Sequence, residues 1–314
     1  MSPVPRTPRI DAHQHFWLLA ERASDSGGCA WPPPELAAIH RDFTPADFEP
    51  LRRAAGIDGT VVVQSLPSEQ ETRQLLGLAE RHDFILGVVG WADMKAPDAP
   101  QRIAALAAHP KLKGLRPMLQ DLDDDAWIAD AAVDPAVRAM RAHGLVFDAL
   151  VLTRHLGALE TFAARHPGLT IVIDHGAKPP IARGQIEPWR AALAPLAARP
   201  NVHCKVSGLL TEAGPHASAQ ALQPYVQALW TLFGPTRLLW GSDWPVLRLA
   251  ADYGAWLDMC QALLSTLAPA PTDEQRAALF GGHAQRVYRL TGHPGSGRRP
   301  HAAAPAGPAP GPEP

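Results

Sequence analysis

The chain has 314 residues, of which 46% are hydrophobic, and its formal net charge is −2 at pH 7. This length suits two average domains or one large α/β barrel, and so small a charge gives no electrostatic reason to expect a nucleic acid or an anionic membrane as a partner. Three cysteines without a CxxC pair disfavour a disulfide framework or a cysteine-built zinc site, and without an apolar leader or a bilayer-spanning stretch we expect a cytoplasmic protein.

The first predicted strand, residues 9–17, reads RIDAHQHFW and carries a His-x-His motif. Side chains alternate along a strand, so Asp11, His13 and His15 are expected to share one face. Two imidazoles at this spacing form one side of a metal or substrate site, because catalytic zinc usually takes three protein ligands and leaves one position open. The motif alone is weak, and both histidines can equally bond to backbone groups or line a groove.

A long stretch without a regular pattern, residues 18–41, follows this strand. It contains two adjacent glycines and three consecutive prolines, so we expect irregular structure. Loops of this length are often lids or binding loops, although surface insertions are at least as common. Trp17 and Trp31 can either cover a cyclic ligand there or serve as packing anchors.

Strand and helix patterns alternate along the rest of the chain. Thr44 precedes Pro45, which suits the first position of a helix that ends at Gly56, and Ser68 with Glu71 predicts a capping box for the next helix. The eight predicted strands cover residues 9–17, 59–65, 84–93, 111–119, 145–151, 169–179, 201–209 and 237–245. A predicted helix follows each strand, and two helices, 253–267 and 272–290, end the pattern.

Short apolar strands that alternate with helices about every thirty residues are typical of a (β/α)8 TIM-like barrel, which is an α/β fold. A doubly wound open sheet would favour a glycine-rich phosphate turn after the first strand, and HQHFW is no such turn. We therefore predict one barrel domain over residues 9–292 that includes the C-terminal helices. Residues 293–314 are rich in Pro and Ala and are predicted to form a disordered tail without a chemical role.

Polar residues gather at the carboxyl ends of the predicted strands, where the chemistry of such barrels takes place. They are His13, His15, Gln64, Ser65, Trp91, Asp93, Arg116, Asp148, Asp174, His175, Lys205, Ser207, Ser242, Asp243 and Trp244. Unpaired buried charge is costly, so these residues predict that something polar is bound there. Strands one and eight are neighbours in a closed barrel. The alternation of side chains along each strand therefore allows four residues to converge: His13, His15, His175 and Asp243.

Several of these residues also have a structural interpretation. Asp243 can cap the loop that follows it, and His175 can be a satisfied core histidine. Arg116 suits a carboxylate or a developing oxyanion, or it forms a salt bridge to Asp148. Asp174 is interpreted as structural, bonding a neighbouring strand end.

A set of motifs in chain order resembles the amidohydrolase superfamily and, within it, the branch of L-fuconolactonases and related sugar-lactone hydrolases. The motifs are DAHQHFW (11–17), RDFTPADFEPL (41–51), VVVQSLPSEQET (61–72), GVVGWADM (87–94), GLRPMLQD (114–121), GLVFDALV (144–151), IDHGAKP (173–179), CKVSGLLTEA (204–213) and LFGPTRLLWGSDWPV (232–246). The resemblance implies a TIM-like barrel and hydrolysis of a lactone ring. By position it implies that His13, His15, His175 and Asp243 bind metal or substrate, with Asp243 as general base and His175 as a further catalytic residue.

The chain departs from the superfamily pattern at two strand ends. The fuller metal set includes a lysine or glutamate on strand four and a second late-strand histidine, whereas this chain offers Arg116 and Asp148 at strands four and five. The resemblance therefore implies one divalent ion, with zinc as the expected identity, or none, because related lactonases can work without metal.

We hypothesise that the protein opens the ring of a sugar-derived lactone, similar to an L-fucono-lactone, with water from which Asp243 takes a proton. The carbonyl would be polarised by an ion on His13 and His15, or by these imidazoles and Arg116 directly. The expected substrate-binding residues are Arg116, Trp17, Gln64, Trp91, Asp148 and Trp244.

Three other functions are open to the same sequence. They are a metal-dependent decarboxylase of the same superfamily, a lactonase for a non-sugar cyclic dicarboxylate, and a binding barrel without catalysis. The expected partner is in each case a small molecule, and a homodimer is left open.

Overall fold

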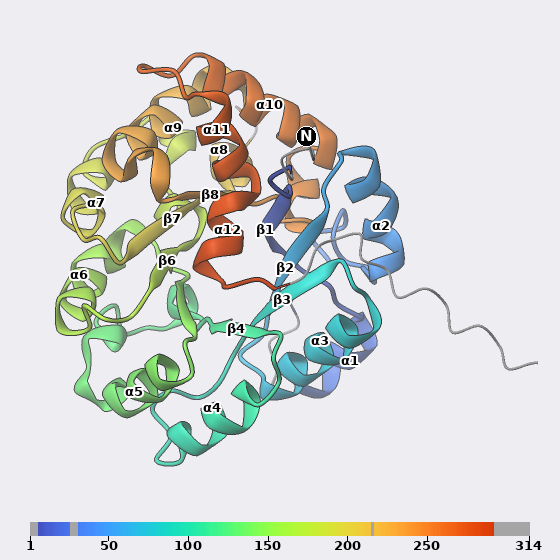
Figure 1. Cartoon of the computed structure of the whole chain (residues 1–314), viewed down its shortest axis with the longest axis vertical. Helices are drawn as coiled ribbons and strands as arrows, with labels where there is room; N and C mark the ends of the chain where they lie inside the picture. The colour runs from blue at the N-terminus through green and yellow to red at the C-terminus, as the bar shows by residue number, and fades with distance from the viewer. Residues whose placement is uncertain (1–5, 26–30, 215–216, 292–314) are drawn as a thin grey trace, which may run out of the picture.

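A computed structural model describes residues 6–25, 31–214 and 217–291 of the chain. At its centre, eight parallel strands form one sheet in which each strand pairs with the next along the chain (Figure 1). The strands are β1 Ile10–Gln14, β2 Gly59–Val63, β3 Ile85–Gly90, β4 Leu112–Leu115, β5 Val146–Ala149, β6 Ile171–Ile173, β7 Val202–Val206 and β8 Leu238–Trp240. The predicted (β/α)8 barrel is confirmed, while the predicted tail over residues 293–314 lies outside the described residues.

Backbone hydrogen bonds join the first and last strands at the mouth of the barrel. Gln14 forms a parallel bridge with Trp244. The His15 N–H donates to the Trp244 carbonyl at 2.7 Å, and the Asp243 N–H donates to the His13 carbonyl at 2.8 Å. These bonds bring the His-x-His motif beside Asp243, although His15 and Asp243 are 228 residues apart in the sequence.

Most helices surround the strands on the outside of the barrel, and α12 lies across one end of it (Figure 1). Their bounds are α1 Leu19–Asp25, α2 Pro45–Ala54, α3 Glu69–Arg81, α4 Ala99–Ala107, α5 Asp134–Ala142, α6 Leu156–Arg165, α7 Trp189–Ala197, α8 Leu209–Ala213, α9 Ala219–Phe233, α10 Tyr253–Ser265, α11 Asp273–Ala277 and α12 His283–Val287. Within the described residues, no helix has the length and apolar character needed to cross a membrane.

Two local predictions about the first helices can be compared with the structure. The start of α2 at Pro45, with Thr44 as its N-cap, is confirmed. The expectation that residues 18–41 are irregular throughout is wrong, because α1 occupies Leu19–Asp25. This seven-residue helix is shorter than an isolated helix needs for stability, and its Arg22 contacts other elements.

Some predicted strands are longer than the observed ones because their last residues turn at the mouth. The sixth predicted strand covers residues 169–179, but β6 ends at Ile173. His175 and Gly176 then adopt left-handed backbone conformations with φ of 54° and 59°, which are incompatible with a strand. The polar end of the predicted strand is therefore a turn that directs side chains into the mouth.

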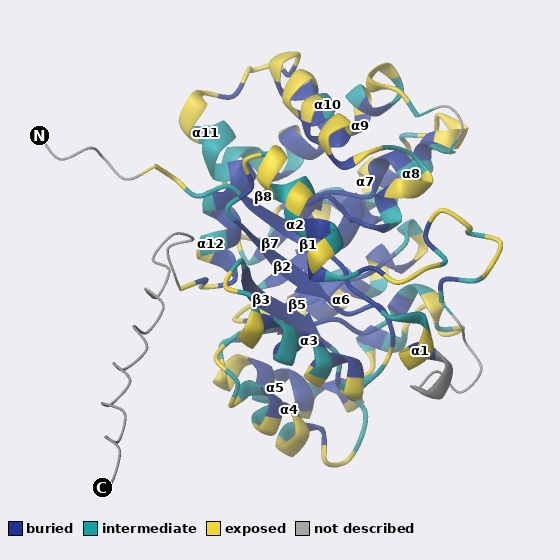
Figure 2. Ribbon diagram, turned by 90° about the vertical axis from the view of Figure 1, so that its right-hand side faces the viewer, coloured by how far each residue is buried: buried dark blue, intermediate teal, exposed yellow. Residues whose placement is uncertain are grey.

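The barrel interior is filled by apolar side chains and closed at its amino end by α12. Ile10, Ala12 and Val61 belong to the same buried cluster as Tyr288, which follows α12. His283 of α12 contacts the carbonyl of Leu238, the first residue of β8, through Nδ1 at 2.7 Å. A second, larger cluster fills the layer between strands and helices, and exposed residues lie on the outer helices (Figure 2). The carboxyl end of the barrel is thus left for a binding site.

Candidate active site

A cavity of about 620 Å³ opens at the carboxyl ends of the strands. Its polar lining includes His15, Arg116, His175, Lys178 and Asp243. Three tryptophans form much of the apolar lining: Trp31, Trp91 and Trp127. The cavity therefore combines an apolar wall with a small group of charged and imidazole side chains, as small-molecule sites usually do.

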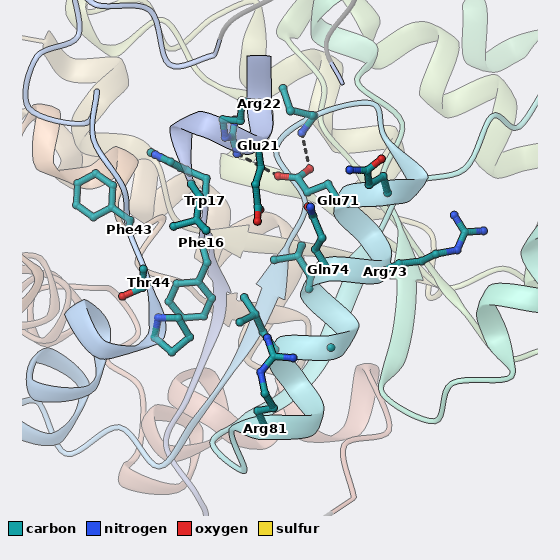
Figure 3. A pocket seen from close by; sticks show the side chains of 17 residues that line it. Phe16, Trp17, Glu21, Arg22, Phe43, Thr44, Glu71, Arg73, Gln74 and Arg81 are labelled. Carbon is teal, nitrogen blue, oxygen red and sulfur yellow. Dashed lines mark hydrogen bonds and ion pairs between the residues drawn. The ribbon is translucent and has the colours of Figure 1, made fainter. Parts of the chain in front are cut away.

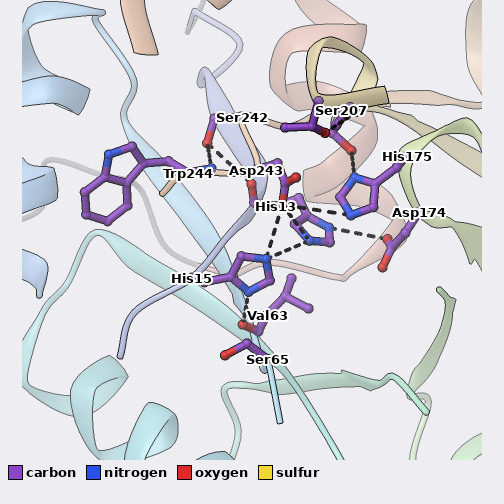
Figure 4. Close-up of polar contacts among 12 residues, drawn as sticks. His13, His15, Val63, Ser65, Asp174, His175, Ser207, Ser242, Asp243 and Trp244 are labelled. Carbon is purple, nitrogen blue, oxygen red and sulfur yellow. Dashed lines mark hydrogen bonds and ion pairs between the residues drawn. The ribbon is translucent and has the colours of Figure 1, made fainter. Parts of the chain in front are cut away.

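Three imidazoles converge on one carboxylate oxygen at the floor of this cavity, where His15 and His175 line it and His13 is fully buried (Figure 4). Oδ1 of Asp243 lies 3.3 Å from Nε2 of His15, 3.7 Å from Nε2 of His13 and 3.9 Å from Nε2 of His175. The two Nε2 atoms of the His-x-His motif are 3.2 Å apart. The predicted convergence of these four residues from β1 and the ends of β6 and β8 is present in the structure.

An irregularity in β1 sets the direction of the side chains in the His-x-His motif. The register between β1 and β2 shifts between Asp11 and Gln14, so the strand does not alternate regularly there. The prediction that Asp11 shares a face with His13 and His15 is therefore wrong. Its carboxylate accepts hydrogen bonds from the Tyr253 hydroxyl at 3.0 Å and from the backbone N–H of Ser242 at 2.8 Å.

A glycine on the segment after β8 makes room for the motif. A Cβ atom at Gly241 would lie 2.7 Å from Cβ of His13, a separation that real side chains do not tolerate. The close approach of the two backbones allows the bond from the Asp243 N–H to the His13 carbonyl. Glycine is thus needed here for space, and it places the carboxylate beside the imidazoles.

In His15 and His175, the ring nitrogen that does not face Asp243, Nδ1, contacts an oxygen atom of a neighbouring residue. Nδ1 of His15 lies 2.7 Å from the carbonyl of Val63, and Nδ1 of His175 lies 2.9 Å from Oγ of Ser207. A carbonyl only accepts, so His15 donates through Nδ1, and this bond turns Nε2 of the ring toward Asp243 in the cavity. The ring orientation therefore suits a ligand atom for a cation.

Among the imidazoles around Asp243, those of His13 and His175 have pKa values below the ordinary value. Burial lowers the pKa of His13 well below its ordinary value and lowers the pKa of His175 to about 4. Burial also opposes ionisation of Asp243, but contacts with His175, His15 and His13 hold the pKa of its carboxyl below the ordinary value. Asp243 is therefore a carboxylate at pH 7, as a general base must be.

Buried charges beneath the cavity pair with one another. Nζ of Lys205 lies 2.5 Å from Asp148 and 2.9 Å from Asp174, and it reaches Nδ1 of His13 at 3.1 Å. Arg116 pairs with Asp174 at 3.2 Å, so the alternative pairing of Arg116 with Asp148 is wrong. The interpretation of Asp174 as a residue that bonds a neighbouring strand agrees with its contact to Lys205 on β7.

Not all predicted substrate-binding residues line the cavity. Arg116 and Trp91 do, whereas Trp244, 1% exposed, packs against Phe43 and Phe48 with ring centroids 5.2 Å away. The sequence pattern cannot separate these cases, because a tryptophan at a strand end can turn toward the mouth or toward the surrounding helices.

Three further predicted residues lie outside the cavity lining. Trp17 lies against Phe43 in a separate cavity outside the barrel. Asp148 is fully buried on Lys205 and on the Tyr288 hydroxyl, which donates to it at 2.8 Å. The amide of Gln64 is also buried and donates to the carbonyl of Arg116 at 2.6 Å.

Sequence reasoning missed several cavity residues. Trp127 and Gln120 lie between β4 and α5, in a segment that contains only short 3-10 turns and no strand end. Lys178 belongs to the motif IDHGAKP and donates to Oε1 of Gln120 at 2.6 Å. Its place near the end of the sixth predicted strand, residues 169–179, was the one available signal.

The donor atoms at the mouth fit a divalent cation. His13, His15 and Asp243 form a group whose ligand atoms lie close together, and a second group joins His13 to Asp174 and His175. Tetrahedral zinc with bonds of about 2.0 Å would separate its ligand atoms by about 3.3 Å. The observed separations of 3.2, 3.3 and 3.7 Å in the first group are close to that value.

Comparisons with known proteins agree with the fold and identify the family. The family model described as Amidohydrolase matches residues 10–290. An L-fucono-1,5-lactonase of Burkholderia ambifaria is 56% identical over 288 residues, which are 90% of this chain and 96% of that protein. An L-fucono-1,5-lactonase of Burkholderia multivorans is 38% identical over 293 residues, again 90% and 96% of the two chains.

A solved structure extends the comparison to three dimensions. The crystal structure of an amidohydrolase from Burkholderia multivorans with bound zinc is 37% identical and superposes with a TM-score of 0.82 over 90% of this chain and 100% of that chain. Family match, sequence identity and barrel architecture lead to the same conclusion: this chain belongs to the amidohydrolase family.

Proposed function

We propose that the protein is a hydrolase that opens the ring of a sugar-derived lactone, with an aldonolactone similar to L-fucono-1,5-lactone as substrate. The observation that carries the proposal is the carboxylate of Asp243 surrounded by three imidazole Nε2 atoms at the floor of the mouth cavity. Its support from relatives is the 56% identity to an L-fucono-1,5-lactonase over nearly the whole barrel.

In this mechanism Asp243 takes a proton from the attacking water and returns it to the ring oxygen when the acyl C–O bond of the lactone breaks. Its Oδ1 faces the three imidazoles, so we assign Oδ2 to the water. A lowered pKa keeps the carboxylate ionised at neutral pH but also makes it a weaker base. A lactone is an activated ester, and a base held beside the carbonyl compensates for its low basicity by position.

Arg116 is the cation that we assign to the developing oxyanion. Its side chain is 3% exposed and lines the cavity, and Nη1 lies 3.4 Å from Nε2 of His13. The ion pair with Asp174 fixes the guanidinium before substrate binds. A preorganised donor of this kind stabilises charge that appears only in the transition state.

We propose zinc as the bound cation, held by His13, His15, His175 and Asp243. It would supply Lewis-acid polarisation of the lactone carbonyl. The protein's own contribution is to orient these ligands: the Val63 carbonyl fixes the ring of His15, and Ser207 fixes the ring of His175.

The cavity walls suit a sugar ring. Trp31, Trp91 and Trp127 offer flat apolar surfaces, while Lys178 and Gln120 offer polar groups for hydroxyls. Aromatic faces with a few placed polar groups bind a carbohydrate by packing and hydrogen bonding together.

A panel of aldonolactones, including L-fucono-1,5-lactone, tests this function by proton release to a pH indicator, with added Zn²⁺ and with chelator. Turnover of sugar lactones above spontaneous hydrolysis is expected. Release of carbon dioxide from an aromatic carboxylate, without lactone turnover, would instead identify a decarboxylase. Turnover confined to a cyclic dicarboxylate lactone would leave the reaction class in place and overturn the sugar substrate.

A further inference from the structure

A second cavity, about 720 Å³, lies outside the barrel between α1, the chain around Phe43 and α3 (Figure 3). It is separate from the catalytic cluster, but Leu66 lines both cavities. Arg22 of α1 and Glu71 of α3 form an ion pair at its wall, with Nη2 and Oε1 3.0 Å apart. Their side chains are only 5% and 6% exposed. A charged pair so deeply buried needs further partners to offset its lost hydration.

Those partners connect Arg22 to one wall of the mouth cavity. Nη1 of Arg22 donates to the carbonyl of Trp31 at 2.7 Å, and Trp31 is one of the residues that line the mouth cavity. Nη2 also donates to the hydroxyl of Ser65, and the guanidinium lies 4.8 Å from the ring centre of Trp17. Through these hydrogen bonds, Arg22 connects the segment that contains Trp31, after β1, with Ser65 at the end of β2.

Glu71 connects the same pair to the neighbouring wall. Its Oε2 accepts hydrogen bonds from the backbone N–H groups of Ser65 at 2.9 Å and Leu66 at 2.7 Å. Its Oε1 accepts from the Ser65 hydroxyl at 2.7 Å. Ser65, Leu66 and Pro67 all line the mouth cavity. One buried ion pair therefore holds two adjacent walls in a fixed relation.

We propose that Arg22 and Glu71 are positioning residues that set the substrate-binding wall formed by Trp31 and residues 65–67. They do not belong to the catalytic group, because His13, His15 and Asp243 are held by backbone bonds between β1 and the segment after β8. The pair acts on substrate binding and leaves the chemical step alone. In its kinetic part the inference rests on the proposed lactonase function.

The kinetic test compares Arg22→Met with the wild-type enzyme on the best lactone of the panel. In Arg22→Met we expect KM to rise about tenfold while kcat stays within about twofold of the wild type. The lost wall contacts stabilise the bound substrate and the transition state equally, so their loss weakens binding without slowing the chemical step. Arg73→Met is the matched control, since Arg73 lines the same outer cavity but pairs with Glu69 on the surface. A loss confined to kcat, or no change in KM, would overturn the proposal.

A double-mutant cycle with Trp31→Ala separates positioning from general stability. The part of the effect that passes through Trp31 is absent in the Trp31→Ala background, so Arg22→Met should raise KM by a smaller factor there than in the wild type. A purely structural role of Arg22 would leave its effect on KM the same in both backgrounds. Equal effects in both backgrounds therefore contradict the inference.

Hydrogen exchange provides a measurement that does not depend on lactone turnover. Peptides covering residues 31–41 and 64–71 should exchange faster in Arg22→Met, while a peptide covering β3 should not change. Unchanged exchange in the first two peptides would overturn the positioning role even if no lactone is turned over. If wild-type enzyme turns over no lactone but exchange accelerates, the proposed function fails and the positioning pair stands.

Milder variants keep the test available if Arg22→Met does not fold. Arg22→Lys retains the charge opposite Glu71 but has one donor group in place of a planar fork, so it cannot bond Trp31, Ser65 and Glu71 with the same geometry. We expect it to raise KM less than Arg22→Met does, by about threefold. A KM equal to that of the wild type would contradict the proposal.

Discussion

At the scale of single residues, two of the four residues at the candidate active centre have an uncommon backbone conformation. Asp243 has φ of 61° and His175 has φ of 54°, in the left-handed region that side chains with a Cβ avoid. Such conformations cost about 1–3 kcal/mol each and persist where surrounding contacts hold them. Here those contacts are the bond from Asp243 to the His13 carbonyl and the contact of His175 with Ser207.

Asp243→Asn should remove the base while leaving the fold in place. The amide has nearly the shape of the carboxyl but cannot take a proton, so kcat for the lactone is expected to fall by about 10²–10⁴-fold. Stopped-flow or steady-state measurement of proton release gives the decrease in kcat, and circular dichroism checks the fold. The exposed Asp98→Asn serves as matched control. Retention of most activity in Asp243→Asn would remove this residue from the base role.

His13→Ala should lower the metal content and the lactone turnover together. Its Nε2 is 3.2 Å from that of His15, so the variant loses one atom from the donor group. We expect bound zinc per chain, measured by mass spectrometry of the metal, to fall by about tenfold or more. His109→Ala, on the surface beside Glu80, should leave both quantities unchanged. Full activity of metal-stripped wild-type enzyme would show that the ion is dispensable.

At the scale of elements, the turns that follow the strands decide which side chains reach the mouth. β6 ends at Ile173 and β7 ends at Val206, and the turns after them meet at His175 and Gly208. Gly208 has φ of 64°, and a Cβ atom there would lie 2.6 Å from Nδ1 of His175. The turn after β7 thus needs glycine both for its backbone and for the space that the imidazole occupies.

Gly208→Ala should consequently disturb both stability and activity. Left-handed strain and the contact with His175 are expected to lower the free energy of unfolding by about 1–3 kcal/mol and to reduce kcat by displacing the imidazole. Urea unfolding and lactone turnover measure the two effects. Gly157→Ala is the control, because Gly157 lies in α6 with nothing within 4 Å of the added atom. An unaltered kcat in Gly208→Ala would argue against a catalytic role for His175.

At the scale of the whole molecule, burial of ionisable groups makes stability depend on pH. His203 on β7 lies outside the active-site cluster, and its Nδ1 has no hydrogen-bond partner within the described part of the chain. Burial, together with the nearby Arg286, Arg237 and His283, lowers the pKa of His203 to about 4. The folded protein therefore resists protonation at a position where the unfolded chain accepts a proton.

The free energy of unfolding should decrease as the pH falls from 6.5 toward 4. In this window the unfolded state binds the proton of His203 and the folded state does not, so each pH unit costs up to about 1.4 kcal/mol for this group. His203→Gln should reduce that slope, measured by urea unfolding at pH 7 and pH 5. The same slope in variant and wild type would show that other groups dominate the acid sensitivity.

The sequence by itself determined the barrel and much of its mouth. Apolar strands at regular intervals require a parallel sheet covered by helices, and the chain order of a barrel makes β1 and β8 neighbours. His13, His15, His175 and Asp243 could be predicted because they are polar residues at strand ends, where an apolar barrel would not place them without a ligand. The α1 helix could not, since seven residues have too weak a pattern of their own.

Only the tertiary structure decided where ambiguous side chains point. Asp11 does not lie on the face of His13 and His15, because the β1 register shifts. Trp244 packs in the core, whereas Trp127 lines the cavity from a segment without a strand end. The pairing of Arg116 with Asp174 rather than Asp148 likewise depends on distances across the barrel. Periodicity records the local direction of a side chain along a regular strand, but bulges, left-handed turns and long-range packing change that direction, and they are set by contacts between residues far apart in the chain.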